Sequence, residues 1–164
     1  MKENEIRLLA ELLKNSKKSD RELGKTLGLS QATVSRTRTK LERDRVIQEY
    51  TIIPDFAKLG FELFAITTAK FKAPRNEKFT ERGVNYMKKY PNIILSSRIQ
   101  GMGKDAIIVS FHKDFTEYEN FMVTLKSDWI DAAEDIESML ISFKGITVKP
   151  FSLKYLAEAL NPSN

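Results

Sequence analysis

Residues 29–44 read LSQATVSRTRTKLERD, and this stretch decides how the first part of the chain is interpreted. Ser30 is a residue type that caps the N-terminus of a helix, and the residues after it suit a helix that runs to about Asp44. A shorter helical pattern ends just before it at Gly28, and Gly permits the positive φ angle that a tight turn needs. Two helices joined in this way are typical of a helix-turn-helix motif.

The residues on either side of this pair extend the motif into a domain. Residues 3–15 have the apolar spacing of an amphipathic helix, and Ser19 with Glu22 three residues later forms a capping-box pattern for the next one. Residues 46–53, VIQEYTII, alternate as a strand does, and Pro54 ends the alternation. We therefore expect residues 1–54 to form a DNA-binding domain of three helices and a short β-ribbon, a winged helix-turn-helix.

The rest of the chain alternates between strand-like and helical patterns. After a linker at 55–60, we expect strands at 61–71, 92–99, 106–112 and 138–143, with helices at 76–90, from 115 onwards, and around 152–160. The order β-α-β-β-α-β predicts a ferredoxin-like βαββαβ sandwich over 61–164, so that the fold class is α+β. Acidic residues between 128 and 137 are expected on a solvated helix face.

Both alternation phases of the first and third of these strands carry Ile, Phe or Ala. Helices can cover only one face of such a sheet, so the second face must also be buried. We therefore expect a homodimer through the C-terminal domain, with dimers of dimers as the larger assembly.

The composition excludes several kinds of site. The chain of 164 residues has no cysteine and a single histidine, His112, which rules out disulfides, thiolate nucleophiles and histidine cages for zinc within one chain. We expect no catalytic residue, no metal and no cofactor. No apolar run is long enough to span a membrane, and the N-terminus has no signal-peptide pattern, so we expect a cytoplasmic location.

Positive charge is concentrated in the first third of the chain. Residues 1–54 hold 12 Lys or Arg and 8 Asp or Glu, a net charge of +4, whereas residues 55–164 hold 15 and 14, a net charge of +1. A basic module beside a nearly neutral one indicates a polyanionic partner for the basic module. The alternative is that charges of both signs merely solvate a small helical domain.

The helix after Ser30 carries the residues that could contact double-stranded DNA. The first turns of a recognition helix point towards base edges, and there Arg pairs with guanine and Gln with adenine. We expect base contacts from Gln31, Thr33, Ser35 and Arg36, and phosphate contacts from Arg38, Thr39, Lys40 and Arg43. Ser30 is mainly a cap at the edge of this set, and Arg45 adds a cation where the wing begins.

The sequence resembles the Lrp/AsnC, or feast/famine, family of bacterial and archaeal transcription regulators, and it resembles the archaeal type in particular. The string Tyr50-Thr51-x-Ile53-x-Asp55-x-x-x-Leu59-Gly60-Phe61 follows the family pattern without a gap, as do Leu41-Glu42 and Val46-Ile47 before it. The run LSQATVSR at 29–36 is similar to the family's LSxxxVSxR. The resemblance covers nearly the whole chain and implies a sequence-specific DNA-binding regulator that responds to an amino acid or another small effector.

Three positions depart from the family pattern. Thr37 stands where an Arg is usual, Arg38 stands at a normally apolar position, and Arg45 replaces a Gly. Members of the family often carry Gly-x-x-Asp near the effector site. Here the corresponding loop, with different spacing, comprises Gly101, Met102, Gly103, Lys104 and Asp105. Asp105 could pair with an α-amino group and the Gly N–H groups with a carboxylate, or the loop could be a plain hairpin turn.

Two other functions are compatible with a protein of this size and composition. An RNA-binding or small-molecule-binding ferredoxin-like protein without specific DNA readout is the main alternative. RNA-binding sheets of this kind stack bases on paired aromatic residues of the central strands, and the segments taken as central, 92–99 and 106–112, offer only Phe111. An enzyme is disfavoured because the sequence has no Cys, a lone His and no phosphate-binding Gly loop.

Overall fold

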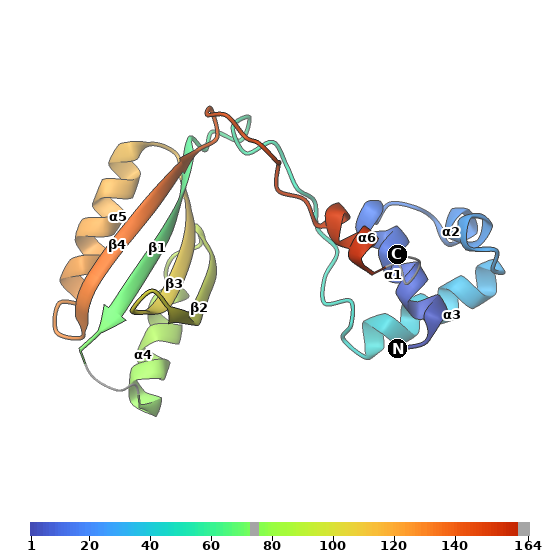
Figure 1. Ribbon diagram of the computed structural model, residues 1–164, viewed down its shortest axis with the longest axis horizontal. Coiled ribbons are helices and arrows are strands. Elements are labelled where there is room, and N and C mark those ends of the chain that lie inside the picture. Colours follow the sequence, from blue (N-terminus) through green and yellow to red (C-terminus); the bar gives the residue numbers. More distant parts are fainter. Residues whose placement is uncertain (73–75, 161–164) are drawn as a thin grey trace. The chain divides into compact units, whose positions relative to one another are not determined.

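The computed structural model describes residues 1–72 and 76–160 (Figure 1). The chain divides into two compact units. The first, the helical unit, comprises Met1–Ile53 together with the C-terminal segment from Lys149, and the second, the sandwich unit, comprises Pro54–Val148. No helix within the described residues is long and apolar enough to cross a membrane.

The helical unit contains the three expected helices, α1 (Glu3–Lys14), α2 (Asp20–Leu27) and α3 (Gln31–Arg43). Ser19 and Glu22 form the capping box at the start of α2, and the Ser30 hydroxyl accepts a hydrogen bond of 3.1 Å from the Thr33 N–H at the start of α3. Gly28 ends α2 with a φ of +70°, the left-handed conformation that favours Gly. The predicted helix-turn-helix is confirmed.

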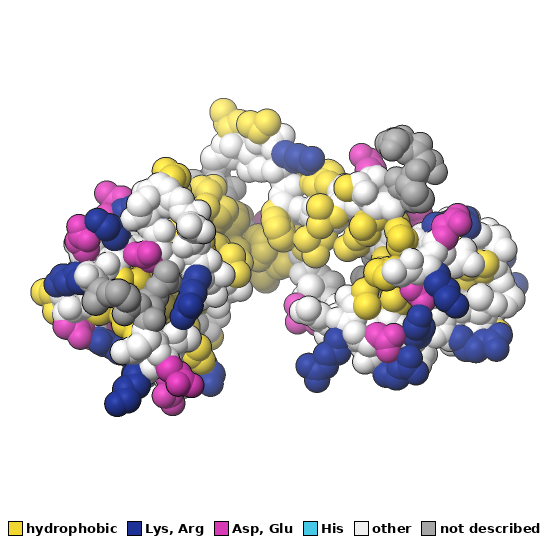
Figure 2. Space-filling model, turned by 60° about the horizontal axis from the view of Figure 1, so that its bottom comes forward, with side chains coloured by type: hydrophobic (Ala, Val, Ile, Leu, Met, Phe, Trp, Pro, Cys, Tyr) yellow, Lys and Arg dark blue, Asp and Glu magenta, His cyan; other side chains and the backbone are white. Residues whose placement is uncertain are grey.

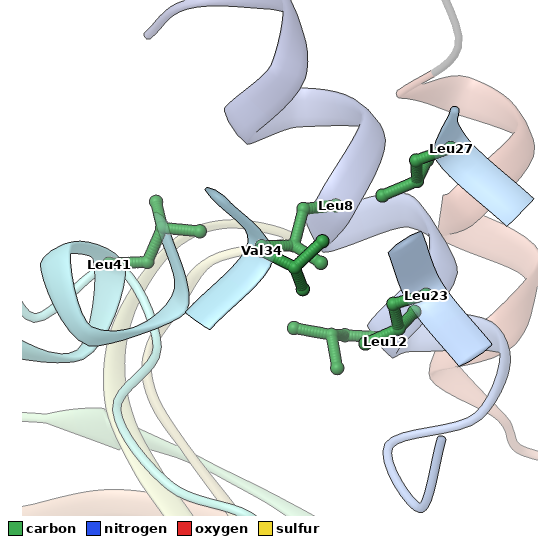
Figure 3. Packing of buried hydrophobic residues seen from close by; sticks show 6 residues of the cluster. All are labelled: Leu8, Leu12, Leu23, Leu27, Val34 and Leu41. Atoms are coloured by element: carbon green, nitrogen blue, oxygen red, sulfur yellow. The ribbon is translucent and has the colours of Figure 1, made fainter. Parts of the chain in front are cut away.

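One cluster of buried aliphatic side chains holds the three helices together (Figure 3). Each helix contributes two of its members, which are Leu8, Leu12, Leu23, Leu27, Val34 and Leu41. Burying one such side chain stabilises the fold by about 1.5–3 kcal/mol. Helices of this length are marginal in isolation, so this cluster is what keeps them folded.

The β-ribbon expected at 46–53 is not formed: no residue between 44 and 62 belongs to a strand. Instead, Arg45 takes a φ of +54°, and the N–H groups of Val46 and Ile47 both donate to the Leu41 carbonyl, which closes the end of α3. A ribbon needs pairing with a second strand, and within the described residues this segment pairs with no strand, so Ile52 and Ile53 stay exposed. The prediction of a paired wing is therefore wrong for this structure.

The C-terminal segment also differs from the expected division, which placed all of 61–164 in one domain. Its described part forms a 3₁₀ turn, η1 (Leu153–Tyr155), and a short helix, α6 (Leu156–Ala159), and both contact α1 of the helical unit. Ala157 is fully buried there. A four-residue helix with one small buried residue fits many surfaces, so the sequence could not indicate which unit it joins.

The sandwich unit has the predicted order of elements: β1 (Leu63–Phe71), α4 (Glu77–Met87), β2 (Ile93–Gly101), β3 (Lys104–His112), α5 (Phe115–Asp128) and β4 (Ala133–Ser142). The strands form one antiparallel sheet in the order β2-β3-β1-β4, which confirms the ferredoxin-like topology. β4 begins five residues earlier than expected, so Glu134, Asp135 and Glu137 lie on a strand and not on a helix face.

The two helices of the sandwich unit cover one face of the sheet. The Thr67 hydroxyl lies 4.0 Å from the Met122 sulfur of α5, so the odd-numbered side chains of β1 face the helices. Tyr86 of α4 joins Phe121, Leu125 and Trp129 in the core on that side. Even-numbered residues of β1, such as Phe64, therefore point to the opposite, open face of the sheet.

An added methyl group should have opposite effects on stability at two glycines that lie in helices. A Cβ on Gly24 would lie 2.7 Å from the Leu29 carbonyl oxygen, whereas a Cβ on Gly83 of α4 would meet only the Trp129 ring, at 3.9 Å. We expect Gly24→Ala to destabilise the helical unit by about 1–3 kcal/mol, because the backbone turn must move. Gly83→Ala should instead stabilise α4 by up to about 1 kcal/mol, because Ala is the better helix former.

Urea denaturation measures both changes. Helical circular dichroism reports both units, and the fluorescence of Trp129, the single tryptophan, reports the sandwich unit. If Gly24→Ala is as stable as the wild type, the turn does not depend on the close packing of Gly24 against the Leu29 carbonyl.

Candidate nucleic-acid interface

One strip of α3 faces solvent. Gln31, Ala32, Ser35, Arg36 and Thr39 are exposed, and they recur at the spacing of one helix face. Val34 and Leu41, on the opposite side, are buried in the cluster that joins the three helices. The helix therefore presents its N-terminal polar residues outward because its apolar residues are fixed inward.

Two of the residues predicted to reach bases are also used by the helix itself. The hydroxyl groups of Ser30 and Thr33 lie 2.8 Å apart within the cap, and the Arg36 Nε donates 3.2 Å to the Ala32 carbonyl. Arg36 remains exposed, and its guanidinium has further N–H groups to offer. Gln31 and Ser35 are exposed at the same end of the helix.

Two cations predicted to hold phosphates form ion pairs within the helical unit. Arg38 Nη2 lies 2.8 Å from an Asp20 carboxylate oxygen and 3.2 Å from the Lys18 carbonyl, and its side chain is only 19% exposed. Lys40 Nζ lies 2.5 Å from a Glu5 oxygen. These two contacts tie α3 to the start of α2 and to α1. The sequence missed the role of Asp20 and Glu5, whose partners lie 18 and 35 positions away.

The departures from the family pattern at Thr37 and Arg38 are explained by these contacts. The Thr37 hydroxyl donates 2.8 Å to the Thr33 carbonyl, one turn back on the same helix, and Arg38 fills its half-buried position with an ion pair. The inward side of α3 is thus packed without the usual apolar residue.

Exposed cations remain beside the strip. Arg43 and Arg45 are exposed at the C-terminal end of α3, although Arg43 Nε also contacts Asp44 at 3.0 Å. Figure 2 shows Lys and Arg side chains gathered along one edge of the helical unit, with acidic side chains between them. This edge can attract a phosphate backbone, since the unit as a whole carries excess positive charge.

The loop considered for an effector is a tight hairpin between β2 and β3. Met102 and Gly103 take φ angles of +53° and +68°, as in a type I′ turn, and Met102 is 97% exposed. Lys104 pairs with Asp135 and Glu137 on β4, and an Asp105 oxygen accepts 2.9 Å from the Phe71 N–H. The two charged residues therefore have structural partners, and binding of an effector at this loop stays a prediction.

His112 is fully buried at the end of β3. Its Nε2 lies 2.8 Å from the Ser110 hydroxyl, and its ring packs against Tyr118 and Phe121 of α5. Burial lowers the pKa of His112 below its ordinary value, which favours the neutral ring. These contacts fit a structural residue of the core.

Comparison with known proteins matches this geometry to a family. A family model of the AsnC-type helix-turn-helix domain matches residues 5–42. The HTH-type transcriptional regulator PH0061 of Pyrococcus horikoshii is 32% identical over 143 residues, which cover 84% of this chain and 90% of that protein. This chain belongs to the Lrp/AsnC family of transcription regulators.

Other relatives of this Lrp/AsnC regulator agree. The HTH-type transcriptional regulator LrpC of Bacillus subtilis is 34% identical over 97 residues, which cover 59% of this chain and 65% of LrpC. The crystal structure of PH0061 matches with a TM-score of 0.77 at 26% identity, over 93% of this chain and 97% of that one. The transcriptional regulator NMB0573 of Neisseria meningitidis, solved as a complex with L-Met, shares the fold with a TM-score of 0.79 at 18% identity, over 93% and 94% of the two chains.

The protein is therefore a DNA-binding transcription regulator, and this function is supported over that of an RNA-binding sheet. The central strands are β3 and β1, not the pair of segments 92–99 and 106–112 expected from the sequence, and they place Phe111 beside Phe64. Those rings stack on each other, with centroids 5.7 Å apart, and Phe111 is buried. They are packed against neighbours and do not form an open platform for bases.

The Glu5–Lys40 contact makes the stability of the helical unit depend on pH. The hydrogen bond from Lys40, with a second from the Lys2 N–H, lowers the pKa of Glu5 below its ordinary value of 4.5. A lowered pKa in the folded state adds stability above the unfolded pKa, and this stability is lost as the pH falls through the folded value. We expect Glu5→Gln to lose less stability than the wild type when the pH falls from about 5 to 3.

Urea denaturation at a series of pH values tests this expectation. Glu3→Gln, an exposed residue of the same first turn, is the matched control and should keep the wild-type profile. Parallel profiles for Glu5→Gln and the wild type would show that the ion pair does not stabilise the folded state.

Proposed function

We propose that the regulator reads its operator by placing the N-terminal half of α3 in the major groove. The observation that carries this proposal is the exposed strip formed by Gln31, Ser35 and Arg36, opposite the buried Val34 and Leu41. Arg pairs bidentately with guanine and Gln with adenine, whereas Ser can donate to either kind of base. Thr33 and Ser30, which cap the helix, lie at the edge of this contact.

Phosphate contacts are assigned to the exposed cations at the other end of the helix. Arg43 and Arg45 suit this role, together with the Thr39 hydroxyl. Arg38 and Lys40 are assigned a structural role and no DNA contact, because they form ion pairs with Asp20 and Glu5. Phosphate contacts set affinity and register, and base contacts set sequence preference. A regulator working on chromosomal DNA belongs in the cytoplasm of its cell.

The two classes of contact predict different binding defects. The preferred duplex is first selected from a random pool. Arg36→Ala should weaken the free energy of binding to it by about 1–3 kcal/mol and relax the sequence preference at one base pair. Arg43→Ala should weaken binding to all duplexes alike and reduce the slope of log K against log salt by about 1. Fluorescence anisotropy at several salt concentrations measures both quantities.

Lys126→Ala is the matched control, because Lys126 is an exposed cation on α5 of the other unit. It should leave affinity and preference unchanged. An unchanged sequence preference in a folded Arg36→Ala variant would contradict the assignment of α3 as the reading helix.

We further propose that two copies associate through the open face of the sheet. Five phenylalanines form a cluster there: the ring centroid of Phe111 lies 4.7 Å from Phe56, 5.7 Å from both Phe61 and Phe64, and 5.4 Å from Phe143. Met139 and Ile141 of β4 are exposed beside them. An apolar surface of this kind favours a protein partner, and a two-fold dimer would present two α3 helices to two half-sites.

A charge on this face should dissociate the dimer. We expect Ile141→Asp to be monomeric at micromolar concentration and to bind DNA at least about tenfold more weakly, because burying an unpaired carboxylate is costly. Val123→Asp, which alters an exposed apolar residue on α5, is the control and should stay dimeric. Light scattering measures the mass in each case, and a monomeric wild type would refute the proposal.

We also propose that an amino-acid effector binds near the hairpin Gly101–Asp105. Its support is the solved L-Met complex of NMB0573, which shares the fold. The two partners of Lys104 and the contact of Asp105 with the β1 backbone weigh against direct capture of an amino acid by these side chains alone. Backbone N–H groups of the Gly-containing turn would have to receive the carboxylate.

A further inference from the structure

The sandwich unit contains a cavity of about 510 Å³ between α4 and the helix-facing side of the sheet. Its wall is largely apolar and includes Val84, Met87, Ile93, Ala106 and Ile108. Pockets that bind small molecules have volumes of about 300–1,000 Å³ and similar linings. The cavity is separate from the hairpin at 101–105, because no residue of that hairpin lines it.

Trp129 gives this cavity a polar group that lacks a partner. It lines the wall and is only 4% exposed, yet its indole Nε1–H has no hydrogen-bond acceptor within the described part of the chain. Buried donors are almost always satisfied in folded proteins. An occupant that brings an acceptor would therefore be favoured over one that is wholly apolar.

The charges around the cavity restrict the occupant further. The charged side chains among its described lining residues are Arg98 and Lys88, both cations, and no Asp or Glu contributes. Arg98 Nη2 donates 2.6 Å to the Thr80 hydroxyl, on the same stretch of α4 as Phe79 and Gly83, which contact Trp129. Arg98 and Trp129 thus both lie beside the first half of α4.

We propose that this cavity binds an apolar carboxylate that lacks an ammonium group, such as a medium-chain fatty acid. We place the carboxylate beside Arg98, in the cavity that Trp129 also lines, and the hydrocarbon chain along Met87 and Ile93. A free amino acid is a poorer occupant, because its ammonium group would lie beside the cations Arg98 and Lys88 with no acidic partner among the described lining residues. The proposal goes beyond DNA reading and does not depend on it.

The single tryptophan makes the site directly observable. Octanoate is the probe, followed by Trp129 fluorescence and by the one indole N–H resonance in a proton–nitrogen correlation spectrum of the full-length protein. We expect saturable binding with a shift of that resonance. Octan-1-ol, which has no charge, and L-2-aminooctanoate, which adds an ammonium group, should each bind about tenfold more weakly. Equal or tighter binding of L-2-aminooctanoate, or no saturable binding of octanoate, would overturn the proposal.

Two variants separate binding from folding. Arg98→Gln should weaken octanoate about tenfold and leave octan-1-ol unchanged, whereas Lys126→Gln, which removes an exposed cation outside the lining, should change neither. Gly83→Leu places a side chain in the cavity and should abolish binding of all three probes without lowering the melting temperature. Equal losses of octanoate and octan-1-ol in Arg98→Gln would assign that residue a structural role. Normal octanoate binding by a folded Gly83→Leu variant would place the ligand elsewhere.

Discussion

The rotation of α3 about its own axis is set by two buried side chains, Val34 and Leu41. They lie seven residues apart, close to two helical turns, so both project from one side of the helix. Because they pack against the leucines of α1 and α2, the directions in which the other α3 side chains point are also set. Gln31, Ser35 and Arg36 face outward as a consequence, and the surface offered to DNA is a product of the hydrophobic core.

The same helix divides its cations between two tasks. Arg38 and Lys40 lie towards the flanks of α3, where acidic residues of neighbouring segments meet them, and both pairs include a side chain with limited exposure. Such pairs are screened less by water than surface pairs, so they can hold α3 against α1 and α2. Fewer cations are then free for phosphates than the net charge of the unit suggests. Part of the positive charge in the sequence therefore forms ion pairs that hold the helices together.

Local patterns predicted most of the fold, because caps and periodicity depend on neighbours in the chain. Ser19, Gly28 and Ser30 marked the helix ends, and the order of helices and strands along the chain indicated the ferredoxin-like sandwich, although the central strands were assigned wrongly. The failures depend on partners distant in the sequence. Residues 46–53 alternate as a strand but have none beside them, and the segment from Lys149 joins the unit at the other end of the chain. For the site, exposure along α3 was predictable, whereas the capture of Arg38 by Asp20 was not.

The sheet of the sandwich unit meets different requirements on its two faces. On the open face, the rings of Phe56, Phe64, Phe111 and Phe143 pack together, and the exposed Met139 and Ile141 of β4 provide the apolar surface that suits association with another protein. On the other face, α5 packs closely through Phe121, Met122 and Leu125, but α4 buries a single side chain, that of Tyr86. Gly83 in the middle of α4 leaves space beside Trp129 that a larger residue would fill. The cavity therefore follows from the composition of one helix, which packs on the sheet with fewer buried side chains than α5 does.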